Sequence, residues 1–335
     1  MQTPRTEFAQ ALKAMSQERG LDPSVILETI KEAIIAAFKR DARERGEDVE
    51  TQEFTVEIDP KNGEAKVFAD GKDVTPPGFG RIAAQTAKQV IHQKIREAEK
   101  GAIMDEFSGR VGTLISGMVL RFDGPDVKID IGKTEAIMPG EERIPTERLS
   151  LNQRLSFLLK EIKEGLRGKE IILSRGDPLF VEKLFAREVP EIGSGNVVIK
   201  LIAREAGVRT KVAVASSQQG VDPVGSCVGQ KGVRVQAVTN ELGGERVDLI
   251  GYSEDLGELV KASLSPADGL SVKVDKKEKL AKVKAPEDQL SLAIGKDGQN
   301  VRLAAKLTGL RIEVEGTGEN LNPVTEDAAS DQKSA

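Results

Sequence analysis

The chain has 335 residues, of which 39% are hydrophobic and 31% charged, a composition that can bury the cores of two or more domains. No apolar run approaches the ~18 residues that a membrane helix needs, so we expect no membrane span. One cysteine, Cys227, and one histidine, His92, exclude disulfides and cysteine-rich zinc sites, and we expect neither a metal nor a cofactor. The first residues lack the ~7–15-residue apolar stretch of a signal peptide, which favours a cytoplasmic location.

The net charge of −5 is spread unevenly along the chain. Residues 1–107 carry 16 Lys and Arg against 20 Asp and Glu, and residues 318–335 carry one against four. The three segments between them, 108–178, 179–253 and 254–317, have net charges of +1, +1 and 0. Binding of a nucleic acid must therefore depend on locally placed cations and backbone donors, because the chain as a whole does not attract an anion.

Residues 1–107 are predicted to form two long helices around a hairpin. Asp22 and Pro23 are typical of a helix start, and apolar residues then recur at helical spacing until Gly46. Two alternating runs, 54–58 and 65–69, flank a turn and predict a β-hairpin. A second amphipathic helix is expected from Arg81 to Phe107, with His92 partly exposed on it and without a catalytic role.

Residues 108–178 change to short β-runs, which predict a small barrel of about five strands of the OB type. The runs are 111–115, 118–122, 127–131, 136–139, 155–159 and 171–173. The segment resembles the S1-type RNA-binding barrel, although any small β-barrel has a similar pattern. Most of the aromatic residues typical of that barrel are missing, and Phe122 is the one candidate for stacking on a base. We therefore expect this barrel to bind RNA weakly.

The strongest signal is an internal repeat with a period of 66 residues. Gly229, Gly232, Val235 and Gly243 recur as Gly295, Gly298, Val301 and Gly309. Around each pair of glycines the predicted order is helix, two strands, helix, GxxG, helix, strand, over residues 179–253 and 254–317. A constant period implies duplicated domains. The two repeats resemble type II (prokaryotic) KH domains. The predicted fold class is thus α+β and multidomain.

The two GxxG loops are the candidate sites for single-stranded RNA. Glycines let the backbone approach a phosphate, and the helix that follows offers free N–H groups at the positive end of its dipole. A KH domain clamps about four nucleotides in this way. Lysines in the loops and arginines in the next helical turn add positive charge. The candidate RNA-binding residues are Gly229, Gln230, Lys231, Gly232, Arg234, Gly295, Lys296, Asp297, Gly298, Asn300 and Arg302, with Phe122 in the barrel. Solvated helix caps are the alternative interpretation for the basic residues, and a core position is the alternative to a base-binding groove for Val228, Val233 and Ile294.

Several runs resemble the NusA family of bacterial transcription elongation, termination and antitermination factors. They are residues 78–91, 188–192, 203–214, 222–229 and 292–304. The resemblance extends from residue 1 to about 316 and implies an N-terminal domain that binds core RNA polymerase, an S1-type barrel and two packed KH domains that hold nascent single-stranded RNA. It also implies a monomer, with other Nus factors and a ribosomal protein as further partners. The chain ends at Ala335, so we expect no acidic C-terminal repeats.

The sequence gives no support for catalysis, because it contains no phosphate-binding GxxxxGK[ST] loop, no strand-linked GxGxxG and no cluster of metal ligands. Two alternatives remain at this point. One is an RNA-binding subunit of an RNA-processing enzyme, and the other is a ribosome-associated KH protein.

We expect the domains to share the work between two partners. Residues 1–107 are predicted to contact polymerase through mixed-charge helix faces near Arg43, Arg45, Glu47, Asp48 and residues 96–100, because a module with four excess acids repels RNA. Residues 108–316 are predicted to contact RNA. Residues 318–335 have few apolar side chains and no periodicity, and we expect a disordered acidic tail there.

Overall fold

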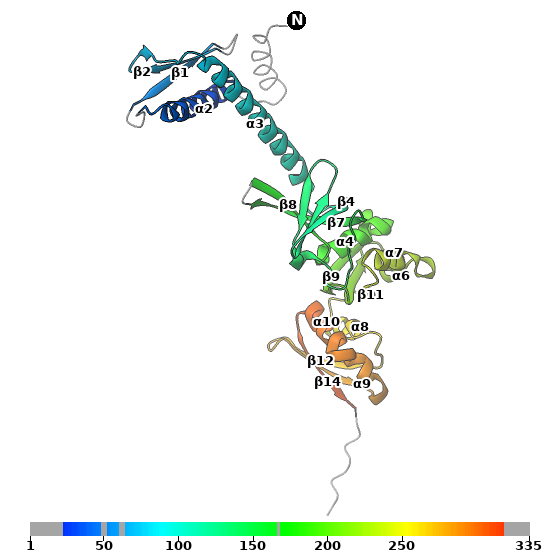
Figure 1. The fold of residues 1–335 in the computed structure, drawn as a ribbon. Helices are drawn as coiled ribbons and strands as arrows, with labels where there is room; N and C mark the ends of the chain where they lie inside the picture. The colour runs from blue at the N-terminus through cyan, green and yellow to red at the C-terminus, as the bar shows by residue number, and fades with distance from the viewer. Residues whose placement is uncertain (1–22, 48–51, 60–63, 166–167, 318–335) are drawn as a thin grey trace, which may run out of the picture. The chain divides into compact units, whose positions relative to one another are not determined.

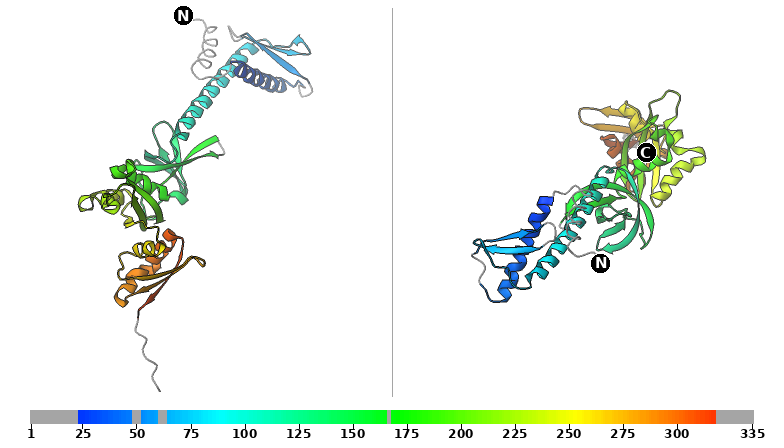
Figure 2. Two further views of the ribbon diagram at one scale, coloured as in Figure 1. Left: turned by 180° about the vertical axis from the view of Figure 1, so that it is seen from behind. Right: turned by 90° about the horizontal axis from the view of Figure 1, so that it is seen from above.

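The computed structural model describes residues 23–47, 52–59, 64–165 and 168–317, and the chain divides into two compact units, Met1–Gly109 and Arg110–Ala335. Figures 1 and 2 show the ribbon from three directions. Asp22, Asp48 and the expected disordered tail lie outside the described residues. Within those residues, no helix combines the length and the apolar character needed to cross a membrane.

Among its described residues, the N-terminal unit contains two helices and a small antiparallel sheet (Figure 1). Helix α2 covers Pro23–Glu44 and α3 covers Phe79–Ser108, while the sheet holds β1 (Phe54–Ile58), β2 (Ala65–Ala69) and β3 (Lys72–Asp73). Both predicted helices and the predicted hairpin are present; the two-residue strand β3 is an addition. Because the apolar residues of each helix lie on one face, they pack together into one core with the sheet. The buried side chains of this core include Ile26, Ile30, Ile34, Phe38, Val56, Val67, Phe79, Ala83 and Ile91.

The next domain is a closed barrel with the strand order β4-β5-β6-β8-β7. Its strands are β4 (Leu114–Asp123), β5 (Asp126–Asp130), β6 (Glu135–Met138), β7 (Arg154–Gly165) and β8 (Gly168–Ser174), with the short helix η1 (Gly140–Glu142) after β6. The predicted five-stranded barrel is therefore confirmed.

One detail of that prediction is wrong, because the first two expected strands form the single strand β4. Gly117 lies between them and marks a place of close packing within the barrel. A Cβ atom at Gly117 would lie only 2.4 Å from a methyl carbon of Ile129 on β5. The register also shifts between Val119 and Arg121, where a bulge bends the strand without interrupting it.

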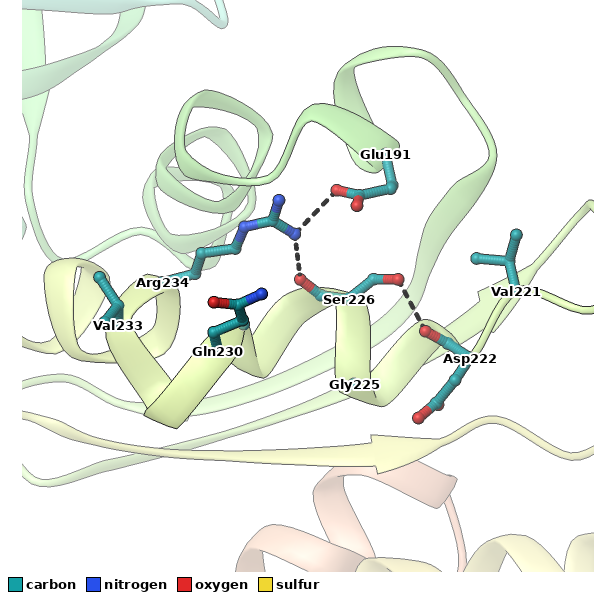
Figure 3. A pocket seen from close by; sticks show the side chains of 9 residues that line it. Glu191, Val221, Asp222, Gly225, Ser226, Gln230, Val233 and Arg234 are labelled. Atoms are coloured by element: carbon teal, nitrogen blue, oxygen red, sulfur yellow. Dashed lines mark hydrogen bonds and ion pairs between the residues drawn. The ribbon is translucent and has the colours of Figure 1, made fainter.

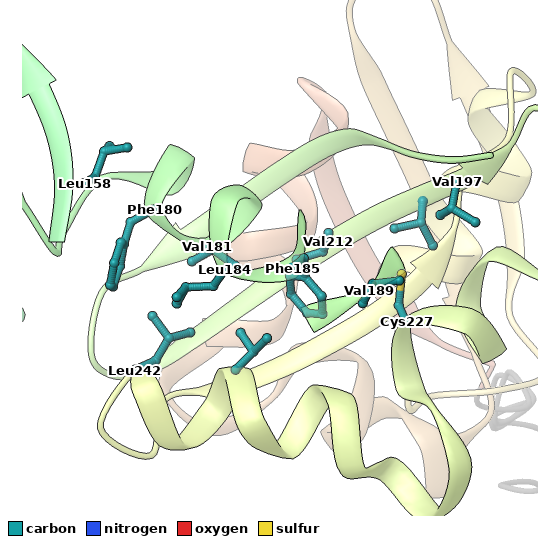
Figure 4. Packing of buried hydrophobic residues seen from close by; sticks show 12 residues of the cluster. Leu158, Phe180, Val181, Leu184, Phe185, Val189, Val197, Val212, Cys227 and Leu242 are labelled. Carbon is teal, nitrogen blue, oxygen red and sulfur yellow. The ribbon is translucent and has the colours of Figure 1, made fainter. Parts of the chain in front are cut away.

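The first repeat follows the barrel. It contains α4 (Pro178–Glu188), α5 (Pro190–Gly193), β9 (Val197–Glu205), β10 (Arg209–Ser216), α6 (Pro223–Val228), η2 (Gln230–Gly232), α7 (Val233–Glu241) and β11 (Arg246–Gly251). The sheet order is β11-β10-β9, in which β10 is antiparallel to β9 and parallel to β11. Helices α4, α6 and α7 enclose a core that rests on one face of this sheet (Figure 4). Its buried side chains include Phe180, Leu184, Phe185, Val212, Cys227 and Leu242.

The second repeat has the same order of elements and the same sheet topology. It contains α8 (Leu256–Ser263), β12 (Ser271–Asp275), β13 (Leu280–Ala285), α9 (Glu287–Ile294), η3 (Lys296–Gly298), α10 (Gln299–Thr308) and β14 (Arg311–Gly316). Strand β13 is central, antiparallel to β12 and parallel to β14. The predicted order of elements in both repeats is confirmed, and α5 is the one helix that the sequence pattern did not reveal.

The two repeats pack directly on each other through an apolar contact. The second face of the first repeat's sheet contributes Ala203, Ala213 and Ile250, which meet Leu259 of α8 together with Leu303 and Leu307 of α10. Strand β10 is consequently buried on both faces from Arg209 to Val214. Burial of apolar surface on both sides of one sheet fixes the position of one repeat against the other.

The barrel is joined to the first repeat by the guanidinium of Arg175, which has no exposed surface. It donates to both carboxylate oxygens of Glu147, at 2.5 and 2.7 Å, on the segment between β6 and β7. It also donates to the backbone carbonyls of Ser156 on β7 and Glu241 on α7, at 2.6 and 2.7 Å. A buried charge is stable only when it is satisfied in this way, so Arg175 makes the barrel and the first repeat one structural body.

Candidate RNA-binding surface

The first GxxG loop connects α6 to α7, and three of its four residues have positive φ angles. Gly229, Lys231 and Gly232 have φ angles of 74°, 53° and 77°. Such positive angles are open to glycine and costly for other residues, so the two glycines are needed where they stand, and Lys231 is held in a strained conformation. Helix α7 begins after Gly232 without a side-chain cap, which leaves its first N–H groups available to a ligand.

The second loop, between α9 and α10, repeats this geometry closely. Gly295, Asp297 and Gly298 have φ angles of 76°, 52° and 70°, and α10 also begins without a side-chain cap. The sequence period of 66 residues therefore extends to the backbone conformation. Asp297 stands at the position of Lys231, and Lys296 at the position of Gln230.

Arg234 holds the first loop in place through two hydrogen bonds (Figure 3). Its Nη1 donates to the carbonyl of Ser226 at 2.6 Å and to Oε2 of Glu191 at 2.9 Å. Its aliphatic carbons also press against Gly229, where a Cβ atom would lie 2.8 Å from Cγ of Arg234. The predicted contact of Arg234 with RNA is untested, but the structure gives its guanidinium two partners within the domain.

Asn300, 66 residues after Arg234, holds the second loop in place through hydrogen bonds of its own. Its Nδ2 donates to the carbonyls of Leu264, Leu292 and Ala293 at 2.8, 3.0 and 3.2 Å. A Cβ atom at Gly295 would lie 2.7 Å from Cβ of Asn300. Asn300 has no exposed surface, so the prediction that it contacts RNA is wrong for its side chain. The residue is internal because it closes the end of α9.

The loop side chains Gln230, Lys231, Lys296 and Asp297 are exposed. Within the described part of the chain, neither lysine ammonium has a hydrogen-bond or ion-pair partner. Val233 and Ile294, beside the loops, are 66% and 36% exposed, so the interpretation of these two as core residues is excluded. Each loop thus presents backbone N–H groups, an ammonium group and an apolar side chain to solvent.

Arg302 ties the second loop to the first repeat. Its Nε donates to Oε1 of Glu205 at 2.7 Å, and its Nη1 donates to the carbonyl of Asp297 in the loop at 3.2 Å. Gln299, at the start of α10, donates from Nε2 to the other oxygen of Glu205 at 2.9 Å. The hydrogen bond from Arg302 holds the pKa of the Glu205 carboxyl below its ordinary value. Glu205 lies on β9, so the first repeat positions the second loop.

Phe122 lies on β4 of the barrel and is 41% exposed. The guanidinium carbon of Arg143 is 6.0 Å from the centroid of its ring. An exposed ring beside a cation suits a stacked base with a nearby phosphate.

The sequence pattern missed Glu191 and Glu205, and it did not reveal the hydrogen bonds that Arg234 and Asn300 donate to helix carbonyls. A signal for the last two was present, because Arg234 and Ser226 lie exactly one period before Asn300 and Leu292. Nothing in the sequence indicated Glu205, since its partners are brought to it by the packing of the two repeats. No group of His, Cys, Asp or Glu within the described ranges is arranged to hold a metal ion.

Comparison with known proteins gives the family. The models of the NusA-like first and second KH domains match residues 175–252 and 256–322, and that of the NusA N-terminal domain matches residues 7–77 and 71–101. Among solved structures, the crystal structure of APE1850 covers 41% of this chain and 97% of its own, at 24% identity and a TM-score of 0.31, which is too low to bear on the fold.

Curated relatives carry the name transcription termination/antitermination protein NusA. The protein from Halalkalibacterium halodurans is 40% identical over 97% of this chain and 92% of its own length. The protein from Bacillus subtilis is 41% identical over 92% of this chain and 90% of its own, and that from Thermus thermophilus is 38% identical over 92% and 89%. With this identity over nearly the whole length of both chains, and with the duplicated KH domains in place, the chain belongs to the NusA family.

Proposed function

We propose that this protein is a transcription termination and antitermination factor that binds nascent single-stranded RNA and RNA polymerase. The observation that carries the RNA-binding half is the pair of GxxG loops with matching backbone angles, each followed by an uncapped helix. Two such loops at fixed positions can clamp two stretches of one strand. The factor modulates pausing, termination and antitermination by holding RNA while attached to the polymerase, and no covalent step is required of it.

Each loop binds phosphate by two means. The N–H groups at the start of α7 and α10 point at the anion, and the dipole of each helix places partial positive charge there. Lys231 and Lys296 add an ammonium point charge. The loops already have a fixed backbone conformation in the free protein. Binding of RNA therefore costs them little further conformational entropy. In the barrel, Phe122 offers a weak additional stacking position.

The N-terminal unit is the proposed polymerase-binding part. Its exposed helix faces carry cations and anions that pair locally, as in the contacts of Arg45 with Asp41 and Glu47 at 3.6 and 3.4 Å and of Lys94 with Glu97 at 3.1 Å. Mixed charges of this kind suit a polar interface of moderate affinity with a protein surface. We further propose a cytoplasmic monomer without a cofactor, with other Nus factors and a ribosomal protein as additional partners.

The full chain with Gln230, Lys231 and Lys296 all changed to Asp tests this proposal. These side chains are exposed, so folding should be retained, which circular dichroism can check. Binding of a labelled single-stranded RNA, followed by fluorescence anisotropy, should weaken at least tenfold because carboxylates then face phosphate. Capture of core RNA polymerase should be unchanged. Wild-type affinity for RNA in the variant would refute the role of the loops, and failure of the wild type to capture core polymerase would refute the polymerase-binding role.

A further inference from the structure

A polar depression lies where the barrel meets the first repeat, at the far end of α7 from the GxxG loop. It has a volume of about 840 Å³ and is lined by β4, the segment before β7, and the C-terminal ends of α4 and α7. We call it the barrel–repeat groove. The residues that matter for its chemistry are Arg148, Gln153, Arg154, Arg187, Asn240 and Glu241.

The carboxylates in the walls of the barrel–repeat groove are already engaged by the protein's own cations. Both oxygens of Glu147 accept hydrogen bonds from Arg175. Oε2 of Glu241 lies 3.4 Å from Nη2 of Arg187, and Oε1 of Glu188 lies 2.9 Å from Nε of the same guanidinium. The acidic side chains therefore offer little to a positively charged ligand.

The unengaged polar groups of the groove are donors. Arg148 and Arg154 are exposed, and no partner for either guanidinium lies among the described residues. Gln153 accepts a hydrogen bond from the backbone N–H of Ser150 at 2.9 Å and keeps its Nε2 free. Asn240 accepts one from Gln236 at 2.9 Å and keeps its Nδ2 free. A wall with satisfied acceptors and vacant donors, two of them cationic, is complementary to a ligand that consists of anionic acceptors.

We propose that the barrel–repeat groove binds the sugar-phosphate backbone of single-stranded RNA, as a continuation of the strand held by the first GxxG loop. This inference rests on the proposed RNA-binding function. The loop lies at the start of α7 and Asn240 in its last turn, and nine residues at ~1.5 Å each separate the two sites by roughly 13 Å. A strand that leaves the loop along α7 reaches the groove within a few nucleotides. Guanidinium forks match phosphate oxygens, and amide N–H groups match phosphate or ribose oxygens.

The test compares two charge-matched double variants of the full chain. Arg148→Gln with Arg154→Gln removes two cations from the groove, and Lys276→Gln with Lys277→Gln removes two exposed cations from the turn between β12 and β13. Their affinities are measured by fluorescence anisotropy with unstructured single-stranded RNAs of 8 and 20 nucleotides at several salt concentrations. The shorter RNA supplies about four nucleotides to each loop, and the longer one extends beyond them.

We expect the groove variant to bind the 20-nucleotide RNA about tenfold more weakly than wild type, and the 8-nucleotide RNA within twofold of wild type. The slope of log affinity against log salt for the longer RNA should fall by about 1.4, since two phosphate contacts are lost at ~0.7 each. Arg148→Lys with Arg154→Lys should restore most of the affinity, and the control variant should change it less than twofold.

Equal behaviour of the groove variant and the control on the longer RNA would overturn the inference. So would loss of polymerase capture with RNA binding intact, because the groove would then be a contact for protein. If the wild-type chain binds neither RNA, the proposed RNA-binding function fails and the inference fails with it. If the groove variant binds the long RNA weakly and the control variant does not, both the proposed RNA-binding function and the inference about the groove are supported.

Discussion

The two repeats build the same loop with different supports. In the first repeat, an arginine that is one-third exposed reaches back to the carbonyl of Ser226 and is itself held by Glu191. In the second, a fully buried asparagine reaches the equivalent carbonyl of Leu292, and Glu205 of the other repeat holds the residues that follow the loop. The backbone angles agree nevertheless. The loop conformation thus depends on a donor to the end of the preceding helix, and the chemical identity of that donor is free to vary.

A second difference is what covers the sheet. The first repeat's sheet is buried on both faces, whereas β13 of the second repeat exposes Lys282 and Lys284 on its outer face. Lys211 pairs in register with Asp248, just as Lys282 pairs with Glu313. The same cross-strand arrangement of a lysine and a carboxylate is therefore buried in one repeat and exposed to water in the other.

Replacement of Asn300 should have the largest effect on stability. Asn300→Leu leaves the carbonyls at the end of α9 without their donor in a buried place, which should lower the free energy of unfolding by about 3 kcal/mol. Arg234→Met should cost no more than about 1 kcal/mol, because water reaches the carbonyl of Ser226 through the partly exposed side-chain position. Urea denaturation of both variants checks this. Equal losses would show that the two supports do not differ as the burial suggests.

Lys211 should make the stability of the protein depend on pH. Burial lowers the pKa of Lys211 to about 8. The carboxylate of Asp248 raises this pKa in part, and the cations Arg209 and Arg246 lower it further. The same lysine in the unfolded chain has a pKa of about 10.4. Between these two pKa values the unfolded chain keeps a proton that the folded chain has released. The free energy of unfolding therefore rises with pH in this range.

The stability of wild type relative to Lys211→Met should therefore increase from pH 8 to about 10.5, by up to ~3 kcal/mol. Thermal or urea unfolding across the pH range measures this difference. Parallel curves for wild type and Lys211→Met would contradict the assigned cost of the buried ammonium.

The loops should differ in their contribution to RNA affinity. Lys231→Asp and Lys296→Asp change the charge equally, but the second loop already contains Asp297, so a phosphate there is held less by side-chain charge. We expect about a tenfold loss for Lys231→Asp, a smaller loss for Lys296→Asp, and a gain of about twofold for Asp297→Asn, on the scale of ~1.4 kcal/mol per tenfold. Anisotropy with one RNA long enough for both loops gives the three values. A larger loss at Lys296 than at Lys231 would reverse this ranking.

Cys227 should matter least. Burial raises the pKa of its thiol to about 11, so the native protein should not react with iodoacetamide at pH 8. The equivalent position in the second repeat is Ala293, which is also fully buried. Cys227→Ala should therefore cost about 1 kcal/mol or less and leave RNA binding intact. Rapid labelling of the native protein would indicate that the first loop opens far more than its contacts suggest.

The comparison also shows how far the sequence alone could lead. The spacing of apolar residues and of turn residues located helices α2 and α3 of the N-terminal unit and nearly every element of the repeats, because these signals are local. The break expected at Gly117 was wrong, since in β4 that glycine serves a close contact with another strand. RNA contact stays a prediction for Arg234 and is wrong for the buried side chain of Asn300. The hydrogen bonds of both residues to helix carbonyls could not be predicted, because the need of those carbonyls for donors is a property of the folded loop.

Glu205 and the barrel–repeat groove could not be predicted from the sequence. Glu205 is separated from Arg302 by 97 residues, and the groove is lined by residues of the barrel and by the C-terminal ends of α4 and α7 in the first repeat. Such sites depend on how domains pack. The net charge of each segment gave no hint of them, because the groove's excess of donors arises from which carboxylates are already engaged.

The central claim is that the two GxxG loops hold one RNA strand together. The most direct test measures the affinity of the full chain for single-stranded RNAs of 4 and 10 nucleotides, with wild type and with Lys231→Asp and Lys296→Asp singly and combined. Binding through both loops should make the longer RNA bind at least ~100-fold more tightly than the shorter one. Lys231→Asp should reduce that advantage about tenfold, and Lys296→Asp should reduce it by a smaller factor. If the 10-nucleotide RNA binds no more tightly than the 4-nucleotide RNA, or keeps its affinity when one loop is disabled, the loops do not act on one strand.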